Sequence, residues 1–178
     1  MRSARFMAAL SVLAIFLALG CSGNRSSNPA LKDAVTKALQ QADLQKVTVD
    51  EDREKNLITL GGTVHSPDAK NRAMDVAKAA APTRVISNQI SVQPVDQESA
   101  ARKISSDVDS AIEKEYQAVL IANHLDKGIH YKAKNGVLTL SGKVDTPDDR
   151  QAAQQLASSV PNVQQVINEL QVKRPSGE

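Results

Sequence analysis

The 178-residue sequence predicts an α+β protein built from two tandem αββαβ domains, each a three-stranded mixed sheet packed on two helices. The first observation is a repeat: ITLGGTVHSPDAK, from Ile58 to Lys70, returns as LTLSGKVDTPDDR, from Leu138 to Arg150. An ungapped alignment of residues 56–92 with residues 136–172 gives ten identities in 37 positions. The second observation is that each copy passes from a strand-like alternation to a helix-like period. A repeat of this length predicts two copies of one fold.

The second copy shows the predicted hairpin most clearly. Its first strand places alternate residues on two faces, one apolar (Ile129, Tyr131, Ala133) and one polar (His130, Lys132, Lys134). Asn135-Gly136 favours a type I′ turn, after which Leu138, Leu140 and Val144 face inward. Gly142 falls in phase with them, and Gly62 repeats it in the first copy, which predicts a bulge or a close approach by the covering helix.

A helix follows each hairpin. Ser66-Pro67-Asp68 and Thr146-Pro147-Asp148 each provide a hydroxyl cap, a proline at the first helical position and an acid in the first turn. Matching apolar faces follow: Ala73, Val76, Ala77 and Ala80 in the first copy, and Ala153, Leu156, Ala157 and Val160 in the second. Each copy ends in a predicted strand, VISNQISV from Val85 and VQQVINELQV from Val163, in which Asn88 corresponds to Asn168.

Another helix precedes each hairpin. The first is predicted to be capped by Asn28 with Pro29 inside it, and the second to begin after Asp96. These elements give a first domain over residues 29–93 and a second over residues 96–174. Because the connection at residues 93–95 is short, we expect the two domains to touch.

The N-terminus predicts export. Arg2 and Arg5 precede an apolar run over residues 6–19, which indicates a signal peptide over residues 1–20 and is too short for a membrane-spanning helix. LALGC, ending at Cys21, resembles the bacterial lipobox in its looser form, because Ala18 stands where leucine is usual. Cys21 is the only cysteine, so the alternative to lipidation, for example with palmitate, is a free or buried thiol.

The lipobox resemblance also implies a location. In bacterial lipoproteins an aspartate after the cysteine favours retention at the inner membrane, and here that residue is Ser22. The resemblance therefore implies lipid anchoring at the periplasmic face of the outer membrane, with residues 21–28 as a flexible tether.

Composition argues against several classes of function. Without Arg2 and Arg5 the 22 basic residues fall to 20, equal to the 20 acidic ones, so no overall field attracts nucleic acid. Tryptophan is absent and only Tyr116 and Tyr131 remain beyond the signal peptide, too few for base stacking. The three histidines, His65, His124 and His130, form no metal motif, and no nucleophile motif is present. We expect no enzyme activity, no cofactor, no metal and no nucleic-acid partner.

The paired motifs resemble the BON domain, named for bacterial osmotically induced and nodulation proteins. LITLGGTV with VISNQISV, and VLTLSGKV with VQQVINELQV, carry the resemblance over residues 31–92 and 104–172. With the lipobox, the chain is similar to dual BON-domain envelope lipoproteins. The resemblance implies a non-catalytic protein that binds phospholipid surfaces and supports outer-membrane integrity or osmotic stress tolerance. The alternative is a periplasmic scaffold whose paired domains hold an envelope protein.

The same resemblance implies a lipid contact at the first helix of the second domain. Arg102 and Lys103 lie at the start of that helix. The resemblance implies an aromatic side chain beside them, and this sequence has none there. Within the apolar stretch Tyr116–Leu125, Leu120 and Ile121 exceed what one helix face can bury. They are expected either to pack between the domains or to form an exposed patch for anionic phospholipid or a partner.

A second group of basic residues is predicted on the second helix of the first domain. Its members are Lys70, Arg72, Lys78 and Arg84. They form either a solvated helix face or a phospholipid head-group patch.

Overall fold

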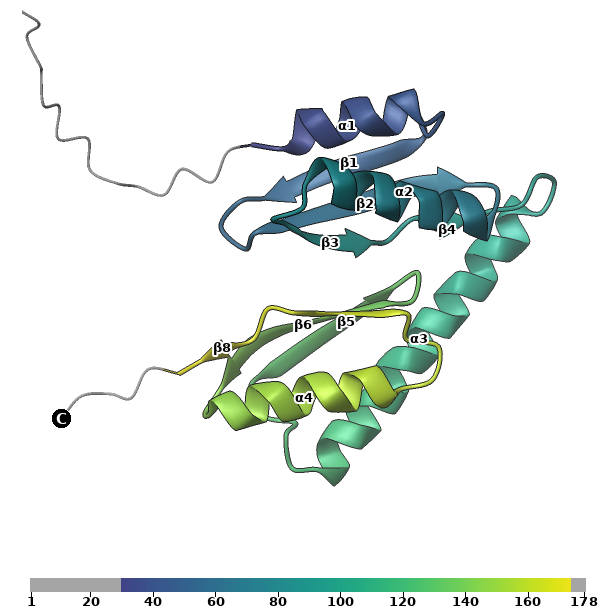
Figure 1. Ribbon diagram of the computed structural model, residues 1–178. Helices are drawn as coiled ribbons and strands as arrows, with labels where there is room; N and C mark the ends of the chain where they lie inside the picture. The colour runs from purple at the N-terminus through teal and green to yellow at the C-terminus, as the bar shows by residue number, and fades with distance from the viewer. Residues whose placement is uncertain (1–29, 174–178) are drawn as a thin grey trace, which may run out of the picture.

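The computed structural model describes residues 30–173, which form two αββαβ units in succession (Figure 1). The first unit contains α1 (Lys32–Gln41), β1 (Val47–Asp52), β2 (Leu57–Val64), α2 (Pro67–Ala80), β3 (Val85–Asn88) and β4 (Ser91–Val92). The second contains α3 (Glu98–Ala122), β5 (Ile129–Lys134), β6 (Val137–Val144), α4 (Pro147–Ser159), β7 (Gln165–Asn168) and β8 (Gln171–Val172). The predicted α+β class is confirmed. The predicted signal peptide and Cys21 lie outside the described residues. The prediction that the first helix is capped by Asn28 with Pro29 inside it is wrong, because α1 begins at Lys32 and Leu31 is at its N-cap position.

Both sheets are mixed and have the same topology. In the first, β2 is central: it pairs antiparallel with β1 and parallel with both β3 and β4. In the second, β6 pairs in the same way with β5, β7 and β8. The parallel pairing arises because a helix carries the chain across the sheet after each hairpin. β3 and β4 are two stretches of one interrupted third strand, and so are β7 and β8.

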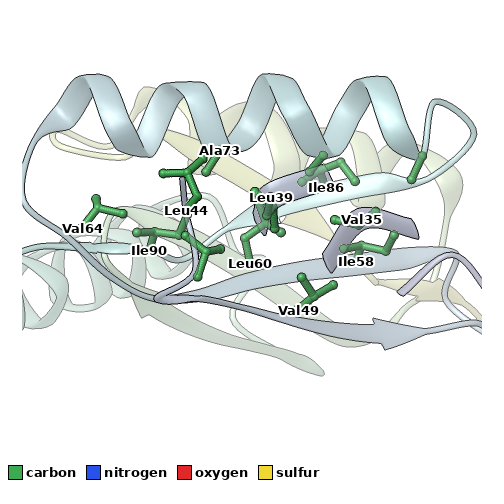
Figure 2. Close-up of a cluster of buried hydrophobic side chains, with 13 residues drawn as sticks. Val35, Leu39, Leu44, Val49, Ile58, Leu60, Val64, Ala73, Ile86 and Ile90 are labelled. Atoms are coloured by element: carbon green, nitrogen blue, oxygen red, sulfur yellow. The ribbon is translucent and has the colours of Figure 1, made fainter. Parts of the chain in front are cut away.

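Each unit has its own hydrophobic core between the sheet and its two helices. In the first unit, Val35 and Leu39 from α1 pack with Ile58 and Leu60 from β2 and with Ala73 from α2 (Figure 2). In the second, Ile112, Tyr116 and Leu120 of α3 pack with Leu138 and Leu140 of β6. Alanines on α2 and α4 let those helices approach their sheets closely. Burial of these side chains stabilises each unit by roughly 1.5–3 kcal/mol per large aliphatic residue.

The break in each third strand is held by an asparagine. The side-chain amide of Asn88 donates to the carbonyl oxygen of Lys70 on α2 at 3.0 Å, and its oxygen accepts from the N–H of Ile90. Asn168 does the same in the second unit, with the carbonyl oxygen of Arg150 at 3.2 Å and the N–H of Leu170 at 3.1 Å. One side chain therefore supplies partners for a strand break and for a helix turn, which explains why both copies of the repeat contain it.

The predicted turn and caps are present. Asn135 and Gly136 both have positive φ, as a type I′ turn requires. The hydroxyl of Ser66 accepts from the N–H of Ala69 at 3.2 Å at the start of α2. Thr146 and Asp149 form a capping box at the start of α4, with bonds of 3.0 and 3.1 Å.

Gly62 and Gly142 allow a close approach of two backbone segments. Both have positive φ, of 88° and 110°. A Cβ at Gly62 would meet the carbonyl oxygen of Lys46, and one at Gly142 would meet that of Gly128. The predicted close approach is therefore correct, but it involves the chain that enters the preceding strand and not the covering helix.

Arg84 corrects one sequence assignment. It lies after α2 rather than on it, and its side chain is fully buried. Its guanidinium pairs with the Glu51 carboxylate of β1 at 2.8 Å and donates to the Asn56 side-chain oxygen at 2.7 Å. The assignment was wrong because the position of Arg84 close to a basic helix in the sequence does not reveal that its ion-pair partner, Glu51, lies on β1.

Glu51 also holds the start of α1. Its carboxylate accepts from the N–H of Leu31 at 3.0 Å and from the N–H of Lys32 at 3.1 Å. Burial opposes ionisation of Glu51, but the N–H of Lys32, the guanidinium of Arg84 and the N–H of Leu31 outweigh it and hold the pKa of this carboxyl below its ordinary value. One charged side chain thus joins the first helix, the first strand and the segment before β3.

The two units touch, as the short connection predicts. Gln165 of β7 donates its side-chain N–H to the carbonyl oxygen of Ile86 at 2.5 Å and accepts from the N–H of Asn88 at 3.0 Å. The Asn135 amide donates to the carbonyl oxygen of Gln89 at 2.8 Å. Lys55 pairs with Glu169 at 2.8 Å, and the hydrogen bond to Glu169 raises the pKa of the lysine. These hydrogen bonds and this ion pair between the units therefore come from β3, β7 and the turns beside them.

We predict that Gly62→Ala lowers the free energy of unfolding by at least about 2 kcal/mol, because alanine disfavours this φ and its Cβ would meet backbone. Urea unfolding would measure the effect. Gly61→Ala is the matched control. Its Cβ would meet only the Thr48 hydroxyl at 2.8 Å, which can rotate away, so its cost should stay within about 1 kcal/mol. Equal urea midpoints for the two variants would contradict this reading.

We also predict that Glu51→Gln lowers the free energy of unfolding by about 2–3 kcal/mol at neutral pH, because it removes the negative charge beside a buried guanidinium. The native state holds the Glu51 pKa below its ordinary value of 4.5, so this contribution is complete above pH 4.5 and is lost as the pH falls. The gap between variant and parent should therefore narrow in acid. Asp145→Asn, which breaks the exposed 2.7 Å pair with Lys173, is the control and should have almost no effect.

Candidate functional site

The start of α3 presents two cations and an exposed apolar side chain. Arg102, Lys103 and Ile104 are all exposed on its second turn, and 63% of Ile104 is accessible to solvent. Lys103 pairs with Asp107 one turn later, with 2.9 Å between Nζ and Oδ2. The spacing of Ile104, Val108, Ala111 and Ile112 predicts one apolar face of this helix, but in the structure Ile104 is exposed. It lies beside the two cations, on the same exposed turn of α3.

Arg102 also lines a polar groove of about 510 Å³ between the two units. One wall comes from α3, and the facing walls come from β4 and β5. Two carboxylates of α3 in this groove are already engaged. Asp109 accepts from the N–H groups of Asn135 and Gly136 at 2.7 and 3.0 Å, and Glu113 accepts from the N–H of Ala133 at 2.9 Å and pairs with Lys132. These carboxylates therefore hold the hairpin in place, and Arg102 keeps its charge available at the mouth of the groove.

The apolar stretch from Tyr116 to Leu125 is divided by the fold. Leu120 is buried in the core of the second unit, whereas Ile121 is 55% exposed. The expectation that both pack between the domains is wrong, because the buried face of α3 includes Leu120 and its own unit covers it. Leu120 is therefore not available for a surface contact, and Ile121 is exposed at a small pocket of about 190 Å³ that Ile129 and Tyr131 also line.

Tyr116 anchors this part of α3. Its hydroxyl donates to the carbonyl oxygen of Ala153 on α4 at 3.1 Å, and its ring meets that of Tyr131 edge to face, with centroids 5.2 Å apart. Burial raises the pKa of the Tyr116 hydroxyl. The tyrosine is thus a core residue that joins α3, α4 and β5.

The basic residues of α2 have different surroundings. Arg72 and Lys78 are exposed. Lys70 is half-buried at the domain contact, where it donates to the carbonyl oxygen of Asn135 at 3.0 Å and to the side-chain oxygen of Gln164 at 3.3 Å. Burial lowers the pKa of Lys70, and nearby Asp109 partly offsets this. Lys70 therefore serves the contact between the units, and only Arg72 and Lys78 face solvent.

Residues 30–173 contain no cluster of three or more His, Cys, Asp or Glu side chains that could hold a metal ion. His65 is exposed, with Nδ1 2.9 Å from the carbonyl oxygen of Gln93. His124 and His130 are exposed on other elements. In the same part of the chain, no helix combines the length and the apolar character needed to cross a bilayer.

Comparison with known proteins identifies the repeat. The BON domain family matches residues 27–94 and again residues 108–174. Osmotically-inducible protein Y of Escherichia coli (strain K12) is 29% identical over 154 residues, which cover 85% of this chain and 75% of that protein.

Two solved structures of CdsD, a structural protein of the type III secretion system of Chlamydia trachomatis, are also similar. One is its C-terminal domain, with 11% identity, a TM-score of 0.34 and coverage of 80% of this chain and 96% of that one. The other has 12% identity, a TM-score of 0.35 and coverage of 81% and 93%. The family matches cover most of the chain and coincide with the two αββαβ units, so the protein belongs to the BON domain family, with two BON domains in tandem.

Proposed function

We propose that the protein is a non-catalytic lipoprotein of the cell envelope that docks on anionic phospholipid and supports outer-membrane integrity or osmotic stress tolerance. The stress assignment is supported by the similarity to osmotically-inducible protein Y. The anchor would be Cys21, and the LALGC sequence that supports it precedes a polar tether. The periplasmic face of the outer membrane is the proposed location, on the basis of Ser22 after the cysteine.

The observation that carries the lipid contact is the exposed group of Arg102, Lys103 and Ile104 on α3. Each basic residue near an anionic surface contributes about 1 kcal/mol, and an apolar side chain beside it can enter the interface between head groups and acyl chains. Because Lys103 shares its charge with Asp107, Arg102 is the stronger electrostatic contact. With a lipid on Cys21, this weak contact would act at a surface to which the protein is already tethered.

The first test is sedimentation of a chain that begins at Ser22 with anionic phospholipid vesicles at low salt. All helices and strands of the two units lie within residues 32–172, so this chain keeps both cores. We predict co-sedimentation that weakens as salt rises, because screening reduces the attraction of exposed charges. Failure to sediment at low salt would rule out the lipid-surface function and favour the scaffold alternative.

Charge reversal then locates the contact. Arg102→Glu with Lys103→Glu should reduce vesicle binding by at least about tenfold, since two favourable contributions become repulsive. Arg72→Glu with Lys78→Glu changes the total charge equally but lies on α2, and it should reduce binding clearly less. Equal losses would show that only the total charge matters.

The anchor makes a separate prediction. Cells that express the full chain with radiolabelled palmitate should label the protein, and Cys21→Ser should abolish the label, since Cys21 is the only thiol. Fractionation of the same cells tests the signal peptide independently, because it shows whether the protein is exported. Labelling that survives Cys21→Ser, or an unlabelled parent, would contradict the lipidation.

A further inference from the structure

The outer edge of β3 shows what the third strand of this repeat can bind. Alternate residues of a strand direct their N–H and C=O groups to opposite edges, and Val85 and Gln89 direct theirs to β2. Ile86 and Asn88 therefore face outward, and the side-chain amide of Gln165 bonds both of them, as the peptide group of a neighbouring strand would. The edge of the first sheet is closed by an amide from the second unit.

The equivalent edge of the second sheet is open. Gln165 and Glu169 direct their N–H groups to Gly136 and Leu140, so Val166 and Asn168 face outward, in register with Leu138 and Leu140 of β6. Among residues 30–173, no group bonds the outward N–H groups of these two residues. An open strand edge with free N–H and C=O groups is a template for another strand.

A groove of about 310 Å³ runs along this edge. One wall is the continuous stretch of residues 166–171 together with Arg150 of α4, and the other belongs to the first unit, from Glu54, Lys55, Leu57 and Val85. Val85 is 48% exposed although it is a large aliphatic side chain on a strand. The Lys55–Glu169 pair lies in the same groove and satisfies both of its charges. The groove therefore offers backbone partners on one side and, on the other, a wall that includes the apolar side chains of Leu57 and Val85.

We propose that this groove, called the β7-edge groove below, binds an extended peptide segment that adds to the second sheet as a strand. The peptide backbone would bond the outward groups of Val166 and Asn168, and a β-branched or other apolar side chain would pack against Leu57 and Val85. The Gln165 contact on β3 supports a peptide, because it shows the same repeat edge occupied by an amide. A peptide of low net charge fits best, since Lys55 and Glu169 neutralise each other and the two other charged residues of the lining, Glu54 and Arg150, are opposite in sign. This site is separate from the proposed lipid contact and does not depend on it.

The test uses the chain from Ser22 and a blocked heptapeptide of zero net charge, Lys-Thr-Val-Thr-Val-Thr-Glu, as the probe. The matched control is the same peptide with its central threonine N-methylated, which removes one backbone donor. In hydrogen exchange followed by NMR, the amides of Val166 and Asn168 should exchange rapidly in the free protein. The probe should slow both by at least about tenfold and leave Asn88, already bonded by Gln165, unchanged. The N-methylated peptide should bind at least about tenfold more weakly.

Two variants separate the groove from other surfaces. Val85→Glu places a charge on the wall of the groove and should weaken the probe by at least about tenfold, whereas Val95→Glu, at a residue that is 60% exposed and outside the groove, should not. Both positions are exposed, so both variants should keep the parent spectrum elsewhere. The proposal would be overturned if the probe did not protect the amides of Val166 and Asn168, or if the N-methylated peptide protected them as well as the probe does. Protection by anionic vesicles instead of by the peptide would also overturn it. The last outcome would assign the groove to lipid.

Discussion

The structure depends on one constraint: side chains must supply hydrogen-bond partners for peptide groups that the two small sheets leave unpaired. A unit of this size buries only a modest core, so each backbone group that is buried without a hydrogen-bond partner costs a large share of its stability. Side chains supply the missing partners: Asn88 and Asn168 at the strand breaks, and Asp109 at the hairpin tip. Gln165 then closes an edge of the other unit. Hydrogen bonds from side chains to peptide groups therefore complete each unit and also join the two units.

Differences between the copies explain why the units are not interchangeable. The repeat places Gln165 where the first copy has Val85. At this position only the second unit has a side-chain amide that can bond the other unit, and it donates to the carbonyl oxygen of Ile86. α1 has 10 residues and α3 has 25, and the extra turns of α3 reach the first unit, as Figure 1 shows. Those turns hold Arg102, Lys103 and Ile104. Duplication therefore supplied a stable fold, and divergence at a few positions supplied the contact between the units and the exposed surfaces.

Local features of the fold could be predicted from the sequence. The turn at Asn135-Gly136 and the caps at Ser66 and Thr146 depend on neighbouring residues alone, and the repeat made each pattern visible twice. Strand order and the partners of Glu51, Arg84 and Gln165 could not be predicted, because each depends on residues that meet only after the sheets form. Leu120 was misplaced for a related reason: counting apolar residues on a helix does not show how wide a face its own sheet covers. The short connection at residues 93–95 predicted that the units touch, and the replacement of Val85 by Gln165 within the repeat was the available signal for which side chain makes the contact.

The two proposed binding surfaces have different physical requirements, and this bears on how they would act together. The start of α3 would use charge and one apolar side chain, so its affinity would fall with salt and depend little on the shape of the ligand. The β7-edge groove would use fixed backbone directions, so it would depend on shape and little on salt. The residues that line the groove include none from α3, so occupation of one surface leaves the other accessible. If Cys21 holds the chain at a membrane, a peptide bound at β7 would be held near that membrane, and the lipid and scaffold alternatives would then describe two faces of one molecule rather than exclusive functions.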